Sequence, residues 1–295
     1  MPSTSWSRVF VPAVAIAVLW ACSSNDSTTP GSEARADGGG GKKDGSSGNP
    51  DGDDPQTPSN RVRTDETVDV DGRSRDYVLS VPKNYDEGRS YPLLLALHGD
   101  GGTAATFVSQ VSFETLVGAD AIVAYPDRSE DLFTPYAENN DQRMLEEIIL
   151  TLKQKYSIDG SKIWGFGYSK GAYQLNEIAC KKPGLLTAMA IHAGGAPQTR
   201  DENDSSIVVC PDAIGIATFV EHGANDDLGG GEFGANYWAS RASCNLSRSP
   251  SSMETCETYD DCDEGTPVVF CVIPNWGHGL YGEASKHAWE WFTSL

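Results

Sequence analysis

The pentapeptide Gly-Tyr-Ser-Lys-Gly at residues 167–171 constrains the fold of this chain more than any other feature. An apolar run at 163–166 precedes it, and residues at helical spacing follow it up to a Lys-Lys-Pro-Gly stop at 181–184. The order strand, Gly-x-Ser-x-Gly, helix predicts a sharp turn that lifts Ser169 above the end of a strand. Any Cβ at the two glycines would collide with the neighbouring strand or helix. The alternative is an ordinary glycine-rich turn with no chemistry.

Two later segments carry the partners that a nucleophilic serine needs. Residues 214–220 and 268–273 have the pattern of buried strands, and Asp226 and His278 lie in the loops after them. Loops at the carboxyl ends of the strands of an open α/β sheet gather on one rim, so Ser169, Asp226 and His278 are predicted to meet. His278 would take the serine proton, and Asp226 would hold the tautomer of the imidazole. The neighbouring Asp227 is the competing acid, and the loop position favours Asp226.

Position along the chain separates His278 from the other histidines. His192 and His222 lie at or near strand ends, where structural hydrogen bonds are the better interpretation. His287 lies in the last predicted helix and is expected at the surface. We therefore expect only His278 to act as a base.

A glycine-rich loop begins at His98, directly after the apolar strand 93–97. Loops of this kind donate a backbone N–H to the tetrahedral intermediate of acyl transfer. We expect the amide of Asp100 to be one donor and the amide of Lys170, the residue after the nucleophile, to be the other. The carboxylate of Asp100 should point away from the developing oxyanion. A plain β–α turn is the alternative interpretation.

From about residue 69 to residue 295, the chain resembles the polyhydroxybutyrate depolymerase and feruloyl esterase group of α/β-hydrolases, similar to carbohydrate esterase family 1. The resemblance runs through YVLSVPKNY (77–85), YPLLLALHGDGG (91–102), IVAYPD (122–127), IWGFGYSKGAY (163–173), EHGANDD (221–227) and PNWGHG (274–279). It implies a serine carboxylic-ester hydrolase that acts through an acyl-enzyme on polyesters or on acyl or feruloyl-type esters. It carries over Ser169, Asp226 and His278, and it implies no cofactor. We also expect no metal.

The chain departs from that family at three places near the expected site. Lys170 stands where the family usually has a small or neutral residue, and Ala172 replaces a second glycine. After His278 the chain has Gly-Leu-Tyr-Gly (279–282) where many members have Trp-Pro-Gly. The acyl specificity of the family is therefore not expected to transfer directly. Segments 127–140 and 244–271 are our candidates for the walls of the substrate cleft.

The alternation of strands and helices predicts a single α/β-hydrolase domain, with a mostly parallel sheet flanked by helices on both faces. Two other functions fit such a scaffold. A peptidase of this fold usually carries a large extra domain, for which the chain has no room. A catalytically dead, surface-anchored binding protein would have no reason to keep all three triad residues. We therefore prefer the esterase.

The N-terminus predicts export. Arg8 precedes an apolar run at 9–20 that is too short to span a bilayer comfortably, and the run ends in Leu-Trp-Ala-Cys, which resembles a bacterial lipoprotein box. We expect a signal peptide at 1–21, a lipid on Cys22 as the only membrane contact, and a place in the bacterial cell envelope at the outer membrane or cell surface. Plain secretion is the alternative. Residues 22–60 lack large apolar side chains and predict a flexible tether, followed by the catalytic domain at 61–295.

Cysteine usage agrees with export. Of seven cysteines, six remain if Cys22 carries a lipid, and an even set in an exported domain predicts disulfides. Cys180 and Cys210 flank the region after the predicted elbow helix and are a reasonable pair. The other four are expected to staple one insertion: Cys244, Cys256, Cys262 and Cys271. A zinc site is the alternative, but the spacings match no common zinc motif.

The formal net charge of −20 argues against some partners. Nucleic acid and other polyanions need a basic surface, so we expect no nucleic-acid partner. The expected partner is an ester or polyester substrate, and we expect a monomer.

Overall fold

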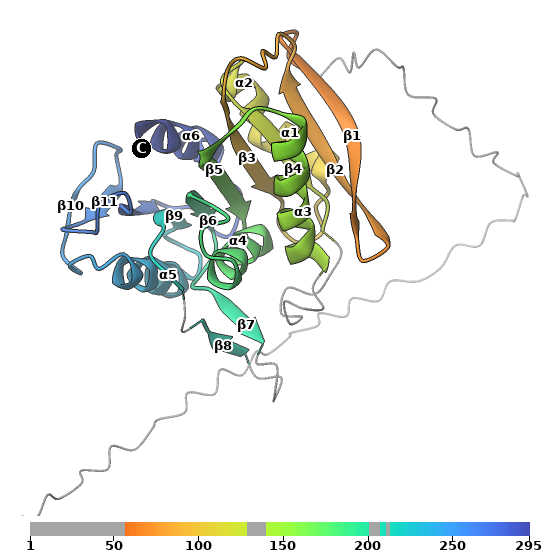
Figure 1. The fold of residues 1–295 in the computed structure, drawn as a ribbon. Coiled ribbons are helices and arrows are strands. Elements are labelled where there is room, and N and C mark those ends of the chain that lie inside the picture. Colours follow the sequence, from red (N-terminus) through yellow and green to blue (C-terminus); the bar gives the residue numbers. More distant parts are fainter. Residues whose placement is uncertain (1–56, 129–139, 201–206, 211–212) are drawn as a thin grey trace, which may run out of the picture. The chain divides into compact units, whose positions relative to one another are not determined.

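The computed structural model describes residues 57–128, 140–200, 207–210 and 213–295 (Figure 1). The predicted signal peptide, Cys22 and most of the predicted tether lie outside these residues, as does most of the candidate cleft segment at 127–140. Within the described ranges, no helix is long and apolar enough to cross a membrane.

In the described residues, ten strands form one sheet in the order β1-β2-β4-β3-β5-β6-β9-β12-β11-β10. The strands are β1 (Arg61–Val70), β2 (Arg73–Pro82), β3 (Tyr91–Leu97), β4 (Ile122–Pro126), β5 (Ile158–Tyr168), β6 (Ala188–His192), β9 (Ala217–Gly223), β10 (Arg248–Pro250), β11 (Cys256–Tyr259) and β12 (Val268–Ile273). From β4 across to β12 all neighbours pair in parallel, and the outer strands pair antiparallel. A short second sheet pairs β7 (Gln198–Arg200) with β8 (Ile207–Val209).

Helices cover both faces of this sheet, as predicted (Figure 1). The apolar cluster on one face contains side chains of α3 (Asn140–Lys155), α4 (Lys170–Lys181) and α5 (Leu228–Arg241). The cluster on the other face contains side chains of α1 (Ala104–Val111), α2 (Phe113–Val117) and α6 (Ala284–Ser294). The parallel strands are therefore buried on both sides, which explains their continuous apolar runs.

The first two strands, β1 and β2, form an antiparallel hairpin. It turns at Asp71 and Gly72, whose φ angles are 54° and 77°. Two positive φ values are typical of the tight turns whose twist matches that of paired strands, and Asp-Gly is a favoured sequence for them.

The strand predicted at 214–220 begins and ends later in the structure. β9 begins at Ala217, and Ile214 is 57% exposed. A Cβ on Gly215 would lie 2.7 Å from the carbonyl oxygen of Arg241, so this segment runs against the end of α5 before it enters the sheet. β9 also continues to Gly223, which makes Glu221 a strand residue.

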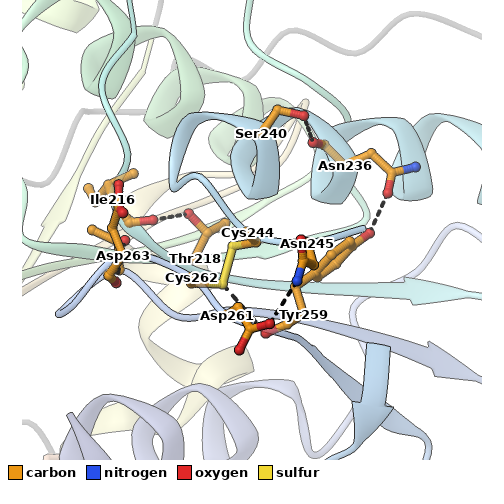
Figure 2. Close-up of a disulfide and its surroundings, with 11 residues drawn as sticks. Ile216, Thr218, Asn236, Ser240, Cys244, Asn245, Tyr259, Asp261, Cys262 and Asp263 are labelled. Atoms are coloured by element: carbon orange, nitrogen blue, oxygen red, sulfur yellow. Dashed lines mark hydrogen bonds between the residues drawn. A yellow bond between two sulfur atoms is a disulfide. The ribbon is translucent and has the colours of Figure 1, made fainter. Parts of the chain in front are cut away.

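Three disulfides join the six cysteines of the domain. Cys180 pairs with Cys210, as the sequence suggested. Cys244–Cys262 (Figure 2) and Cys256–Cys271 staple the segment that holds β10 and β11. Cys256 lies directly opposite Cys271 in the antiparallel pair of β11 and β12, which places the two Cβ atoms close enough to be bridged. These thiols are therefore not available to a zinc ion.

Candidate active site

Ser169 lies in the sharp turn between β5 and α4. Its φ is 52° and its ψ is −117°, a conformation that costs a non-glycine residue about 1–3 kcal/mol. A Cβ on Gly167 would lie 2.5 Å from the carbonyl oxygen of Gly171, and a Cβ on Gly171 would lie 2.4 Å from the carbonyl oxygen of Leu97. Both glycines are thus required sterically, and the second lets the elbow approach the end of β3.

The structure brings Ser169, His278 and Asp226 together. The Oγ of Ser169 lies 2.9 Å from Nε2 of His278, and Nδ1 of His278 lies 2.9 Å from Oδ2 of Asp226. The two loops that carry His278 and Asp226 pack directly on one another, because the amide of Asn225 donates to the carbonyl oxygen of Trp276. These contacts join residues up to 109 positions apart in the chain.

Asp226, and not its neighbour, contacts the histidine. Asp227 caps α5 instead, where its carboxylate accepts a hydrogen bond from the amide of Gly230. Burial acts to raise the pKa of Asp226, but hydrogen bonds from the Asp227 amide and from His278 outweigh it and bring that pKa below its usual 3.8. An ionised Asp226 only accepts hydrogen bonds, so Nδ1 of His278 carries a proton and Nε2 can face Ser169 as a base.

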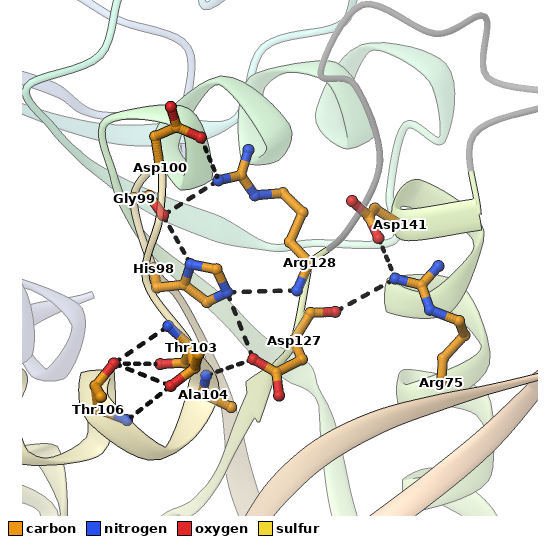
Figure 3. Close-up of polar contacts among 10 residues, drawn as sticks. All are labelled: Arg75, His98, Gly99, Asp100, Thr103, Ala104, Thr106, Asp127, Arg128 and Asp141. Atoms are coloured by element: carbon orange, nitrogen blue, oxygen red, sulfur yellow. Dashed lines mark hydrogen bonds and ion pairs between the residues drawn. The ribbon is translucent and has the colours of Figure 1, made fainter. Parts of the chain in front are cut away.

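The loop after β3 is held from two sides (Figure 3). The carbonyl oxygen of Gly99 accepts hydrogen bonds from Nδ1 of His98 at 2.7 Å and from Nη2 of Arg128 at 3.1 Å. The backbone N–H of Arg128 donates to Nε2 of His98, which fixes the tautomer of that ring. In a trans peptide the C=O and N–H point in opposite directions, so anchoring the Gly99 oxygen also sets the direction of the Asp100 N–H.

Asp100 and Lys170, whose amides are the expected oxyanion donors, also contact each other through their side chains. Nζ of Lys170 lies 2.7 Å from Oδ1 of Asp100, and this hydrogen bond lowers the pKa of Asp100. The carboxylate of Asp100 is exposed. Lys170 is the first residue of α4, so its backbone N–H has no acceptor within the helix and lies at the positive end of the helix dipole.

The remaining histidines have structural partners. Nε2 of His222 lies 3.1 Å from the carbonyl oxygen of Gly194, and burial lowers the pKa of this histidine. His192 contacts the buried carboxylate of Glu221 at 2.9 Å, as expected of a structural histidine. The expectation that His287 is a surface residue is wrong: its Nδ1 lies 2.6 Å from Glu221, and its side chain is only 21% exposed.

Sequence reasoning missed Arg128 and Glu221. Arg128 is buried beside the glycine-rich loop, and Glu221 is buried between His192 and His287. Both residues could have been found from one signal in the sequence. Each is a charged residue at or just after the carboxyl end of a strand, where polar groups gather in an α/β sheet. For Glu221 the misplaced strand boundary hid that signal.

Comparison with known proteins agrees with this fold. No protein-family model matches the chain. The chain is 27% identical over 241 residues to a probable feruloyl esterase C of Aspergillus terreus, an alignment that covers 74% of this chain and 84% of that protein. It superimposes on the acetyl xylan esterase from Aspergillus awamori with a TM-score of 0.60 at 16% identity, covering 79% of this chain and 100% of that one. For the feruloyl esterase module from Clostridium thermocellum, complexed with sinapinate, the TM-score is 0.56 at 13% identity, covering 78% and 86%.

The sheet order, the helices on both faces and these structural neighbours define the α/β-hydrolase fold. In sequence the chain is similar to feruloyl esterases, and these relatives support an esterase.

Proposed function

We propose that this esterase is a serine hydrolase in which Ser169 is the nucleophile, His278 the general base and acid, and Asp226 the residue that orients the base. The observation that carries the proposal is the chain of two 2.9 Å contacts from Ser169 Oγ through His278 to Asp226. The strained backbone at Ser169 supports it, because such strain persists only where the surrounding structure imposes it.

The reaction follows from these contacts. Ser169 Oγ attacks the carbonyl carbon of the ester while Nε2 of His278 takes the hydroxyl proton. The tetrahedral intermediate then collapses: the bond to the alkoxy oxygen breaks, and His278 returns the proton to the departing alcohol. Water attacks the acyl-enzyme with His278 again as base, which releases the acid and restores Ser169.

The backbone N–H groups of Asp100 and Lys170 would stabilise the oxyanion. Supporting this, the Gly99–Asp100 peptide is held by His98 and Arg128, and the Lys170 amide opens a helix. Donors that are oriented before the reaction need no reorganisation as charge develops. Removing one such donor typically costs a factor of about 10²–10³ in kcat.

For the acyl group we propose acetyl or hydroxycinnamoyl esters. The support is in the relatives, which are named feruloyl esterase and acetyl xylan esterase. Polyester cleavage remains a second hypothesis from the resemblance to depolymerases. Assays on p-nitrophenyl acetate through octanoate, methyl ferulate and poly(3-hydroxybutyrate) rank these substrates.

The three disulfides support an exported protein, because such bonds persist in oxidising compartments. We further propose that the mature chain begins at Cys22, that this cysteine carries a lipid, and that residues 22–60 tether a monomeric enzyme to the bacterial envelope. Metabolic labelling with an alkyne fatty acid tests this: label in the protein that disappears in Cys22→Ser supports anchoring, and secretion without label refutes it.

The decisive test of the function is Ser169→Ala. We expect it to abolish ester hydrolysis and labelling by a fluorophosphonate probe, with unfolding midpoints close to those of the wild type. Hydrolysis that survives this substitution would exclude Ser169 as the nucleophile. A folded wild type without hydrolysis or labelling would favour a dead scaffold.

A further inference from the structure

Three ionisable side chains lie behind the loop that carries His278, and the mechanism above does not use them. Glu221 in β9 is 1% exposed and lies between two histidine rings. Nδ1 of His192, at the end of β6, is 2.9 Å from one carboxylate oxygen, and Nδ1 of His287, in α6, is 2.6 Å from the other. Three separate elements thus converge on one buried carboxylate.

The charge state of Glu221 sets the tautomer of His192. Burial acts to raise the pKa of Glu221, but the hydrogen bonds from His192 and His287 outweigh it, so that pKa lies below its usual value. An ionised carboxylate only accepts hydrogen bonds, so Nδ1 of His192 must donate to it. The other ring nitrogen, Nε2, then points its lone pair to the far side of the ring.

The lone pair on Nε2 of His192 points at the backbone of the residues that follow His278. Nε2 of His192 lies 3.0 Å from the amide nitrogen of Tyr281, which donates to it, and 3.0 Å from the carbonyl oxygen of Gly279. One ring nitrogen cannot serve a donor and an acceptor at once. The Gly279 oxygen has another donor, the indole Nε1 of Trp276 at 2.8 Å, so Nε2 of His192 is free to accept from the Tyr281 amide and both backbone groups have a partner.

His278 needs such an anchor. It stands between two glycines, Gly277 and Gly279, so its backbone is intrinsically free. Its side chain is 52% exposed, and the ring of Tyr168 lies 5.9 Å away between centroids. The exposed imidazole is therefore held mainly by its hydrogen bond to Asp226, so its position also depends on the bonds that fix the loop on either side of it.

We propose that His192, oriented by the buried Glu221, is a positioning residue for His278: it accepts the hydrogen bond of the Tyr281 amide and anchors the turn at 279–281. Its catalytic consequence rests on the proposed function, whereas the anchoring does not. A misplacement of about 1 Å can cost roughly 10² in rate, so loss of the anchor should lower kcat far more than it changes KM.

Two uncharged replacements of His192 distinguish its two roles, which are to accept the hydrogen bond of the Tyr281 amide and to donate one to Glu221. Asparagine places its amide where Nδ1 was, so His192→Asn keeps a donor to Glu221 and loses the acceptor for Tyr281. Glutamine reaches the Nε2 position, so His192→Gln keeps an acceptor for Tyr281. We expect His192→Asn to lower kcat by about 10–100-fold with KM nearly unchanged, and His192→Gln to stay within about fivefold of the wild type.

Hydrogen exchange gives the second measurement. The Tyr281 amide should exchange at least about tenfold faster in His192→Asn than in the wild type, and much less so in His192→Gln. The matched control is Glu177→Gln, which alters another carboxylate of 1% exposure, in α4, away from the turn. It should lower stability while leaving both kcat and Tyr281 exchange near the wild-type values.

Three results would overturn the proposal. These are unchanged Tyr281 exchange in His192→Asn, faster exchange with unchanged kcat, and greater damage from Gln than from Asn, which would mean that His192 merely holds Glu221. Exchange requires no substrate. A folded wild type that hydrolyses no ester would therefore refute the proposed function, while Tyr281 exchange would still decide whether His192 anchors the turn.

Discussion

The close approach of the elbow to the end of β3 makes Gly171→Ala an informative perturbation. The added Cβ would lie 2.4 Å from the carbonyl oxygen of Leu97 and 2.7 Å from that of His98. Both are backbone atoms, one at the end of β3 and one at the start of the glycine-rich loop, so no flexible side chain can move aside. To restore a normal contact of about 3.4 Å, α4 and this loop must separate by roughly 1 Å.

Two effects of that separation can be sized. Overpacking of this kind costs about 1–3 kcal/mol, and alanine in a helix recovers up to about 1 kcal/mol, so we expect a net loss of roughly 1–2 kcal/mol of stability. For a domain of this size we expect Tm to fall by roughly 2–8 °C. The same displacement separates the two expected oxyanion donors, and a 1 Å misplacement costs about 10² in rate.

The assay compares kcat, KM and Tm of Gly171→Ala with those of Gly160→Ala. Gly160 lies in β5, the strand that leads into Ser169, and a Cβ there would meet only the end of the Lys153 side chain at 3.9 Å. We expect about 100-fold loss of kcat in Gly171→Ala and almost none in Gly160→Ala. Wild-type kcat and Tm in Gly171→Ala would refute the reasoning, because the backbone contact would then carry no cost.

Two further predictions concern the charged groups of the site. Lys170→Met and Asp100→Asn should each lower kcat/KM by only about two- to fivefold, because the ion pair between these side chains is exposed. The double variant should be no worse than the poorer single one, and the control is a variant that neutralises the exposed Arg89–Asp120 pair. A loss above about 100-fold would mean that Lys170 or Asp100 acts in the chemistry itself. The second prediction concerns how stability depends on pH. The hydrogen bond to Glu221 raises the pKa of His287 above 6.5, and the charges of Glu290 and Glu283 add to this shift. The pKa of Glu221 itself lies below 4.5. The stability that His287 contributes is lost as pH rises, and the stability that Glu221 contributes is lost as pH falls. In urea unfolding, the free energy of unfolding of the wild type should therefore exceed that of His287→Gln by most between pH 4.5 and 6.5. A difference that grows towards pH 8.5 would contradict this.

Much of the fold could be predicted because its determinants are local. Apolar runs buried on both faces define the parallel strands, and Asp-Gly at 71–72 specifies the hairpin turn. The glycine spacing around Ser169 defines the elbow. The boundary of β9 could not be predicted, because Ile214 is apolar but packs outside the sheet, and only the position of α5 decides this.

The sequence by itself determined which residues stand at the strand ends: Ser169, Asp226 and His278 in chain order on an alternating α/β pattern. Only the tertiary structure decided that Asp227 caps a helix, that the Gly99 carbonyl is held by His98 and Arg128, and that Glu221 joins His192 to His287. The physical reason is the range of the interaction. Backbone turns and strand burial depend on neighbours along the chain, whereas Glu221 and His287 are 66 residues apart and meet only when the sheet and α6 have packed.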